Sequence, residues 1–329
     1  MKPLGLTVGD PAGVGPELSL AVASDPRWMP SAPVILIGSI ELLARVAAHI
    51  DMTVQFRPVL PGEPVTARPG VAHVIDVPLD AAAVVPGRVT ADNGRFTVDT
   101  ISRATRLAQA GKISAVISAP ASKEAFNLAG YHYEGQTEIF ADLTGTEGFH
   151  TLLVGGPMRV SLVSAHCSML EAVSRVNFAR ITRILGELDA TLRARFGLAD
   201  PRIGVAGLNP HAGENGLFGR EEVDEVRPAV ESLRRQGRDV VGPLPSDSLF
   251  AAAEDGRFDA VLAMYHDQAT IPLKRYGYVS YAAGLPIIRT TPGHGTAFDI
   301  AWTGKADVGL LARAASLAES LAERRPATA

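Results

Sequence analysis

Residues 259–277, DAVLAMYHDQATIPLKRYG, contain a short apolar run that ends abruptly at a histidine and an aspartate, His266 and Asp267. A run of this length, bounded by polar residues, is typical of a buried strand in a parallel sheet. Core packing does not require the polar pair, nor the basic pair Lys274 and Arg275 that follows. The stretch therefore predicts a buried strand and a ligand bound just beyond its end.

Similar apolar runs recur along the chain, and segments with helical spacing lie between them. Strands that alternate with helices predict βαβ units, hence an α/β fold with a largely parallel sheet and helices on both faces. A chain of 329 residues is long for one core, so we expect two domains. The runs lie near the N-terminus and at 33–38, 114–119, 158–165 and 202–208, and the helical segments at 99–111, 176–197 and 225–237.

The composition is that of a globular protein that binds a small molecule. It is 47% hydrophobic and 20% charged, with a net charge of −4 and both signs interspersed. No basic face indicates nucleic acid, and no run of about 20 apolar residues indicates a membrane span. Cys167 is the single cysteine, which excludes an intrachain disulfide and fits a reducing compartment. The N-terminus reaches Gly, Asp and Pro too early for a signal peptide, so we predict a cytoplasmic protein.

Three histidines follow predicted strands within a few residues. His166 follows the run 158–165, His211 follows 202–208, and His266 ends the opening stretch. Ligands of open α/β sheets bind at the carboxyl ends of strands, and three imidazoles with an open position are a catalytic zinc-type site. The gaps, 45 residues from 166 to 211 and 55 from 211 to 266, form no local metal motif. Helix caps or loop residues therefore remain an alternative interpretation.

Other segments predict anion or cofactor contacts. GDPAGVGPE, residues 9–17, is neither a G-x-G-x-x-G motif nor a P-loop, but its amides could face an anion. Lys274 and Arg289 are candidate phosphate ligands, with a solvated surface charge as the alternative. Gly293 and Gly295 flank His294 and permit close approach of a ligand, although a tight turn would also explain them.

Five segments in order resemble the 4-hydroxythreonine-4-phosphate dehydrogenase (PdxA) family from end to end: GDPAGVGPE, SAPASKEAFNLAG, GLNPHAGENGLFGREE, YHDQATIPLK and GLPIIRTTPGHGTAFDIAWTGKAD. The resemblance implies a fold similar to isocitrate and isopropylmalate dehydrogenases, with two α/β/α domains and the active site in the interdomain cleft. The expected domains are 1–132 with 290–329, and 133–289, which carries the metal ligands and dimer contacts. It also implies a homodimer in which both subunits build each site.

The resemblance assigns roles by position. It implies metal ligation by His166, His211 and His266, phosphate binding by Lys274 and Arg289, and substrate contact by Thr137. It implies a nicotinamide-cofactor segment with His294, Gly295, Thr296 and Asp299, and it leaves Asp267, Asp247 and Lys123 as catalytic candidates. The implied metal is zinc, with cobalt, nickel, magnesium and manganese as alternatives, and NAD and NADP stay equally open.

Two positions depart from the family pattern. Gln136 stands in GQTE where the family has GHTE, and Ser280 stands where the family has an asparagine. Glutamine cannot titrate near neutral pH, and serine reaches less far than asparagine. These changes suggest a paralogue that acts on a related compound, such as 4-phospho-D-threonate or 4-phospho-D-erythronate, and they leave the pyridoxine-biosynthesis intermediate, a 4-phosphooxy-threonine, open as the other substrate type.

The predicted reaction is a metal-dependent, NAD(P)-linked oxidation of the secondary alcohol of a phosphorylated hydroxy acid, giving a 3-oxo acid that decarboxylates. A dehydrogenase of a non-phosphorylated cis-dihydrodiol carboxylate is one alternative, and Lys274 and Arg289 argue against it. Two further alternatives are a phosphate acyltransferase and a non-catalytic phosphosugar sensor. The three histidines argue against the first, because an acyltransferase of this kind needs no metal triad. The absence of a signalling segment in the sequence argues against the second.

Overall fold

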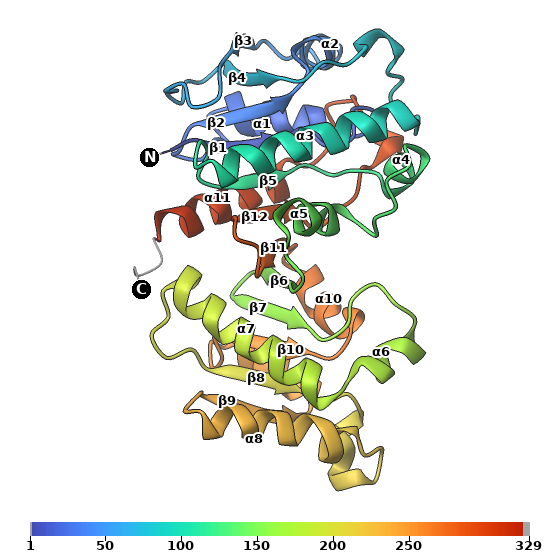
Figure 1. Cartoon of the computed structure of the whole chain (residues 1–329), viewed down its shortest axis with the longest axis vertical. Helices are drawn as coiled ribbons and strands as arrows, with labels where there is room; N and C mark the ends of the chain where they lie inside the picture. The colour runs from blue at the N-terminus through green and yellow to red at the C-terminus, as the bar shows by residue number, and fades with distance from the viewer. Residues whose placement is uncertain (1, 325–329) are drawn as a thin grey trace. The chain divides into compact units, whose positions relative to one another are not determined.

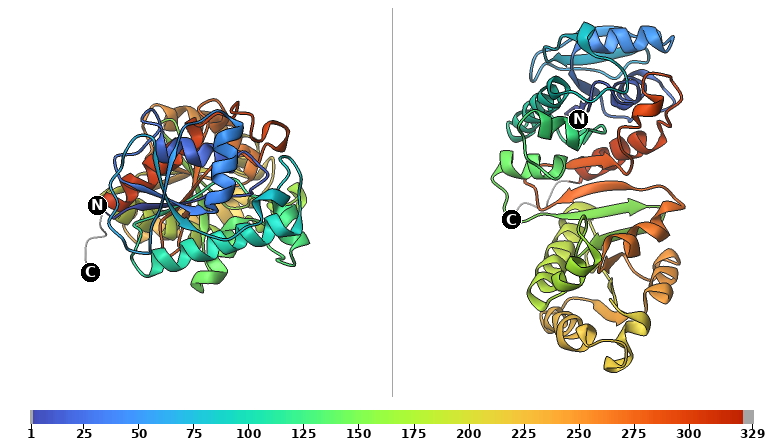
Figure 2. Two further views of the ribbon diagram at one scale, coloured as in Figure 1. Left: turned by 90° about the horizontal axis from the view of Figure 1, so that it is seen from above. Right: turned by 90° about the vertical axis from the view of Figure 1, so that its right-hand side faces the viewer.

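The computed structural model describes residues 2–324, which form two compact units (Figures 1 and 2). Unit 1 comprises residues up to Phe149 and the segment Leu285–Glu323, and unit 2 comprises His150–Gly284 with Arg324. The chain therefore leaves unit 1 after residue 149 and returns at residue 285. Across the described residues, no helix combines the length and apolar character needed to cross a membrane.

Unit 1 contains a parallel sheet with strand order β3-β4-β2-β1-β5-β12. Its central strands are buried throughout, as their continuous apolar runs predict. The strands are β1 (Leu4–Thr7), β2 (Val34–Gly38), β3 (Gln55–Pro58), β4 (Val71–Asp76), β5 (Val116–Ser118) and β12 (Arg289–Pro292).

Helices cover both faces of this sheet. α3 contacts β1, β2 and β5 together with α4 and α5, whereas α1 contacts α2 and α11 (Figures 1 and 2). Ser39, Thr90 and Ser122 cap the starts of α2, α3 and α4 by accepting a backbone N–H, as short hydroxyl side chains do at helix N-termini. The elements are α1 (Gly15–Ser24), α2 (Ile40–His49), η1 (Ala81–Ala83), α3 (Ala91–Gln109), α4 (Lys123–Leu128), α5 (Gln136–Thr144), η4 (Phe298–Ile300) and α11 (Gly309–Glu323).

Unit 2 contains a mixed sheet with order β11-β6-β7-β10-β8-β9. β6 runs antiparallel to both β11 and β7, and the other pairs are parallel. Gly156, with φ of 55°, and Pro157 join β6 to β7, a hairpin signal that the strand count from apolar runs missed. The strands are β6 (His150–Gly155), β7 (Met158–Leu162), β8 (Ile203–Ala206), β9 (Val240–Leu244), β10 (Ala260–Ala263) and β11 (Val279–Ala283).

The helices of unit 2 pack around a core that includes Val160, Leu162, Val261 and Leu273. The opening stretch supplies β10 and then α10, a helix that starts at His266 and that the sequence pattern had not predicted. The elements are α6 (Met169–Arg175), α7 (Phe178–Phe196), η2 (Pro210–Gly216), η3 (Glu222–Val226), α8 (Arg227–Arg235), α9 (Ser246–Glu254) and α10 (His266–Lys274).

The α/β class is confirmed, and the boundaries between units differ from the expected ones. Residues 133–149 lie in unit 1 because α5 packs on α3. The return also comes earlier than residue 290, since Leu285, Ile287 and Ile288 are buried in unit 1. Packing between segments distant in the sequence, which composition does not reveal, sets both limits.

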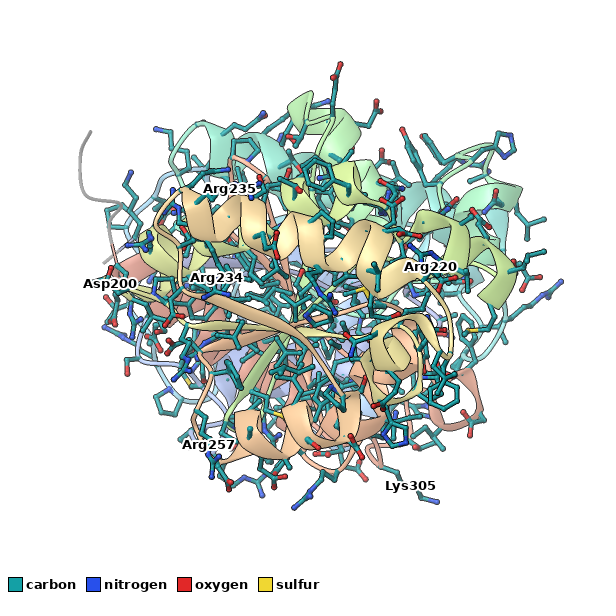
Figure 3. The ribbon with its side chains drawn as sticks, turned by 90° about the horizontal axis from the view of Figure 1, so that it is seen from below. Asp200, Arg220, Arg234, Arg235, Arg257 and Lys305 are labelled. Carbon is teal, nitrogen blue, oxygen red and sulfur yellow. The ribbon has the colours of Figure 1, made fainter. Side chains whose placement is uncertain are left out.

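The surface of unit 2 carries arginines on three segments: the end of α8, the loop before η3 and the turn after α9. Figure 3 shows Arg220, Arg234, Arg235 and Arg257 spread over this face, and all four are exposed. Arg220 forms an ion pair with Asp224 at 2.8 Å. The positive charges are thus interspersed rather than gathered.

Candidate functional site

A buried arginine forms the centre of a candidate anion site in unit 1. Arg289 begins β12 and is 3% exposed. Its Nε donates to Ser118 Oγ at 3.1 Å, its Nη1 donates to Thr137 Oγ1 at 3.0 Å, and its guanidinium lies 5.3 Å from the centre of the Phe140 ring. The structure therefore brings together two predicted substrate residues, Arg289 and Thr137, that are 152 positions apart.

The charge of this arginine is not neutralised by a close carboxylate. Burial lowers the pKa of the Arg289 guanidinium to about 10, and the nearby Glu138 carboxylate acts to raise it. The group is therefore still protonated at neutral pH. Within residues 2–324, no carboxylate lies within 4.0 Å of it. A buried cation that has hydroxyl partners but no ion pair is suited to an anionic ligand.

The N-terminus of α5 adds further groups to this site. Gly135 precedes the helix and provides no side-chain cap, so the first amides remain available to an anion. Gln136 is the first helical residue, and its Nε2 donates to the Ala119 carbonyl at 3.1 Å. The Lys123 Cε lies 4.0 Å from the position that a Cβ would take on Gly135. Three of the predicted substrate-binding residues, Gln136, Thr137 and Arg289, thus converge, and the catalytic candidate Lys123 lies beside them.

Sequence reasoning missed Asp10, an acidic residue in the turn after β1. Its side chain is fully buried; Oδ1 accepts from the Ala12 amide at 2.9 Å, and Oδ2 has no hydrogen-bond partner in the described part of the chain. Burial raises the pKa of the Asp10 carboxyl to about 6, against the lowering effect of the Ala12 amide. The signal available in the sequence was an acidic residue three positions after the end of a buried strand, in a Gly- and Pro-rich turn.

The predicted cofactor segment packs against this turn. The Val14 amide donates to the Thr296 carbonyl at 2.9 Å, and Trp302 Nε1 donates to the Pro11 carbonyl at 3.1 Å. A Cβ on Gly13 would come within 3.0 Å of the Thr296 carbonyl oxygen, so a glycine permits the approach. Gly295 and Thr296 therefore lie beside GDPAGVGPE, a juxtaposition that the sequence did not predict.

Two other predicted cofactor residues differ in their surroundings. His294 Nδ1 lies 3.0 Å from the Gly295 carbonyl, and its Nε2 is buried without a hydrogen-bond partner among the residues that the structure describes. Asp299 lies in η4 and is exposed. His294 is thus held by its own loop, whereas Asp299 is accessible.

In unit 2 the structure brings together two of the three predicted metal ligands. β7 and β10 are parallel neighbours, so the residues beyond their carboxyl ends meet. The ring centres of His166 and His266 lie 5.7 Å apart, beside Cys167 in a hollow of about 270 Å³. His266 Nδ1 lies 2.8 Å from Asp267 Oδ1, a contact that fixes the ring and leaves Nε2 for a ligand.

His211 lies on a loop with unusual backbone geometry. Residues 211–215 all have positive φ, between 44° and 77°, and the His211 ring centre lies 6.2 Å from that of Phe218. Glu222, buried in η3, holds this loop: its two carboxylate oxygens accept from the Asn209 backbone amide at 2.7 Å and from Asn209 Nδ2 at 2.9 Å. No local sequence pattern indicates this role for Glu222.

The donor set of one chain fits a divalent ion only in part. Two imidazoles, one of which is oriented by a carboxylate, are suitable ligands for zinc and similar ions. In the part of the chain that the structure describes, however, no three His, Cys, Asp or Glu side chains lie close enough to hold a metal. His211 does not complete the set within a single chain.

The remaining predicted residues of unit 2 lie outside the histidine hollow. Asp247 is exposed in the first turn of α9, where Oδ1 accepts from the Ser248 amide at 2.8 Å. Lys274 is exposed at the end of α10, and Ser280 pairs with Leu153 between β11 and β6. The local contacts of Asp247 are those of a helix start.

Comparison with known proteins places these features in one family. Residues 30–318 match the family described as pyridoxal phosphate biosynthetic protein PdxA, and the chain belongs to this family. It is thus an oxidoreductase of the dehydrogenase type that acts on CH–OH groups, as the sequence predicts.

The names of the similar proteins refer to two different substrates. The chain is 43% identical to D-threonate 4-phosphate dehydrogenase of Salmonella typhimurium, over 98% of this chain and 99% of that one. It is also 43% identical to 4-hydroxythreonine-4-phosphate dehydrogenase of Pseudomonas putida, over 99% and 100%. The crystal structure of 4-hydroxythreonine-4-phosphate dehydrogenase from Klebsiella pneumoniae matches with a TM-score of 0.91 and 42% identity, over 98% of both chains.

A more distant structure belongs to an enzyme with an unphosphorylated substrate. Terephthalate 1,2-cis-dihydrodiol dehydrogenase of Burkholderia xenovorans matches with a TM-score of 0.66 and 33% identity, over 97% of this chain and 98% of that one.

Proposed function

We propose that this protein is a metal-dependent, NAD(P)-linked dehydrogenase of a four-carbon phosphorylated hydroxy acid. The substrate is of the 4-hydroxythreonine 4-phosphate or D-threonate/D-erythronate 4-phosphate type. The observation that carries the proposal is the buried Arg289, which is charged and has no carboxylate within ion-pair distance in the described chain. The names of the similar dehydrogenases support the same substrate class.

The residues around Arg289 are arranged to bind and orient an anion. Ser118 Oγ and Thr137 Oγ1 both accept hydrogen bonds from the guanidinium, so each hydroxyl proton is free to be donated to a ligand. The uncapped amides of α5 add further donors. Binding a phosphate there fixes the distant reacting carbon, because orientation alone accelerates a reaction strongly.

The cofactor would be held by residues 294–299 beside the turn of GDPAGVGPE. When bound, a nicotinamide cofactor accepts the hydride of the substrate's secondary alcohol. The glycine at position 13 and the bond from Val14 to Thr296 keep the two segments in contact. The buried, unpartnered His294 Nε2 is suited to a polar group of the ligand.

His166 and His266 would hold the divalent ion, zinc by preference, and a second subunit would complete the ligand set. A bound ion supplies Lewis acidity to the oxidation and to loss of CO₂ from the 3-oxo acid. The predicted homodimer is supported by apolar side chains exposed on α6 next to the histidines: Met169 is 58% and Leu170 85% exposed. The proposed compartment is the cytoplasm.

The test is reduction of NAD⁺ and NADP⁺ by metal-reconstituted protein with 4-hydroxythreonine 4-phosphate, D-threonate 4-phosphate, D-erythronate 4-phosphate and their unphosphorylated forms. Only phosphorylated compounds should be oxidised. Arg289→Ala should lower kcat/KM at least about 100-fold, since losing a charge-assisted pair costs about 3 kcal/mol. Arg103→Ala, which removes an exposed arginine of α3, should leave kcat/KM unchanged.

A terephthalate-type cis-dihydrodiol carboxylate belongs in the same panel, because the Burkholderia xenovorans structure is similar over nearly the whole chain. Oxidation of this compound in preference to every phosphorylated one would overturn the proposed substrate class.

A further inference from the structure

The side-chain amide of Gln136 has a defined orientation. Its nitrogen lies 3.1 Å from the Ala119 carbonyl, which can only accept a hydrogen bond, so the NH₂ group faces that carbonyl. The amide oxygen is the atom that remains. This Oε1 is buried and has no hydrogen-bond partner among residues 2–324. A buried acceptor without a donor is costly, so the position requires a donor from a ligand.

The Gln136 side chain lies beside the anion site around Arg289. Gln136 directly precedes Thr137, whose hydroxyl is bonded to Arg289, and both residues lie in the uncapped first turn of α5. A ligand held by Arg289 is therefore next to the Gln136 oxygen. The donor that the acceptor requires would be a group of the same substrate whose anion Arg289 binds.

The charges around the site decide which kind of donor fits. Arg289 is a buried cation, and its charge is screened less than that of an exposed residue because water and salt do not surround it. Lys123 adds a second, exposed cation, and Glu138, whose Oε2 lies 3.2 Å from the Cβ position of Gly135, supplies one carboxylate. The local balance is positive, and the Gln136 oxygen is neutral. An ammonium group would meet net repulsion, whereas a hydroxyl donates without adding charge.

We propose that Gln136 is a specificity-determining residue that accepts a hydrogen bond from the C2 hydroxyl of the substrate and so selects a 2,3-dihydroxy acid 4-phosphate over its 2-amino counterpart. This inference rests on the proposed function. The inference distinguishes the two substrates for which the similar enzymes are named, because D-threonate 4-phosphate carries a hydroxyl at the carbon where 4-hydroxythreonine 4-phosphate carries an amine. A histidine at this position can be a cation or a neutral donor, whereas the free Gln136 oxygen can only accept.

The experiment compares kcat/KM for D-threonate 4-phosphate and 4-hydroxythreonine 4-phosphate in wild-type protein, Gln136→Glu and Gln136→Met. Calorimetric dissociation constants for both compounds, measured without nicotinamide cofactor, give a readout independent of turnover. Gln109→Glu is the matched control, because it adds the same charge at an exposed position at the end of α3.

Wild-type protein should prefer the hydroxy compound at least tenfold. Gln136→Glu should reduce that ratio at least tenfold in kcat/KM and in affinity, since a carboxylate favours the ammonium. Gln136→Met, which offers no acceptor, should bind the hydroxy compound about 10-fold to 100-fold more weakly. Gln109→Glu should leave the ratio unchanged.

Turnover of both compounds with a ratio that Gln136→Glu does not alter would overturn the role of Gln136 alone. A wild-type preference for the amino compound would do the same. Failure of wild-type protein to oxidise either compound would overturn this inference, and failure with D-erythronate 4-phosphate as well would overturn the proposed function.

Discussion

Replacement of Asp10 by asparagine tests the electrostatics of the turn after β1. The Asp10 carboxyl is fully buried, one of its oxygens has no partner, and burial raises its pKa from 3.8 to about 6. An asparagine side chain does not ionise, but its amide oxygen can still accept the bond from the Ala12 amide. The variant Asp10→Asn therefore removes the buried charge and keeps the turn.

The direction in which the free energy of unfolding changes with pH follows from proton binding in the folded and unfolded states. Between pH 3.8 and about 6 the folded protein holds the proton more tightly than the unfolded chain, so the free energy of unfolding falls as pH rises through this window. A pKa that is about 2 units higher in the folded state lowers the free energy of unfolding by about 3 kcal/mol once Asp10 is ionised in both the folded and the unfolded protein. About half of this, roughly 1.4 kcal/mol, develops between pH 5 and pH 8.

Urea unfolding followed by tryptophan fluorescence measures the effect. Both tryptophans, Trp28 and Trp302, lie in unit 1, and Trp302 donates to the carbonyl of Pro11, next to Asp10. Between pH 5 and pH 8, the free energy of unfolding of Asp10→Asn should rise by about 1.4 kcal/mol relative to that of wild-type protein. Asp99→Asn, at an exposed position of α3, should show no such change. A difference between Asp10→Asn and wild type that stays constant with pH would refute the reasoning.

Three further substitutions test the turn, the loop and the proposed dimer. Gly9→Ala should destabilise unit 1 by more than about 2 kcal/mol in urea unfolding, because φ is 73° and the new Cβ would lie 2.1 Å from the Pro120 carbonyl oxygen. Glu222→Gln should cost about 1–3 kcal/mol in thermal unfolding and increase hydrogen exchange at 210–216, since one of the two bonds from Asn209 loses its acceptor. Leu170→Glu should shift the protein toward monomer in sedimentation velocity, because this 85% exposed leucine lies on α6.

Each of these variants has a matched control. Gly70→Ala has the same φ of 73° with nothing near the new Cβ, so it should cost only about 1 kcal/mol, and an equal loss in both variants would contradict the proposed clash. Glu231→Gln changes an exposed glutamate of α8, and Leu60→Glu changes a 75% exposed leucine of unit 1. Unaltered exchange in Glu222→Gln, or unaltered sedimentation in Leu170→Glu, would count against the loop anchor and the dimer surface respectively.

The sequence by itself determined the features that are encoded locally. Apolar runs predicted β2, β5, β7, β8 and β10, and helical spacing predicted α3, α7 and α8, because both signals repeat within a few residues. The position of His166 and His266 just past two strands predicted their proximity, since adjacent parallel strands end at the same edge. The motifs that resemble one family were sufficient to predict membership in it.

Only the tertiary structure decided the features that depend on distant residues. Arg289 meets Ser118 and Thr137 across 171 and 152 positions, and no local pattern specifies such a pairing. The raised pKa of Asp10 and the unpartnered oxygen of Gln136 likewise arise from burial by segments far away in the chain. Hydrophobic periodicity fixes which face of an element is buried, whereas packing fixes which polar groups share that buried space and therefore their charge and hydrogen bonding.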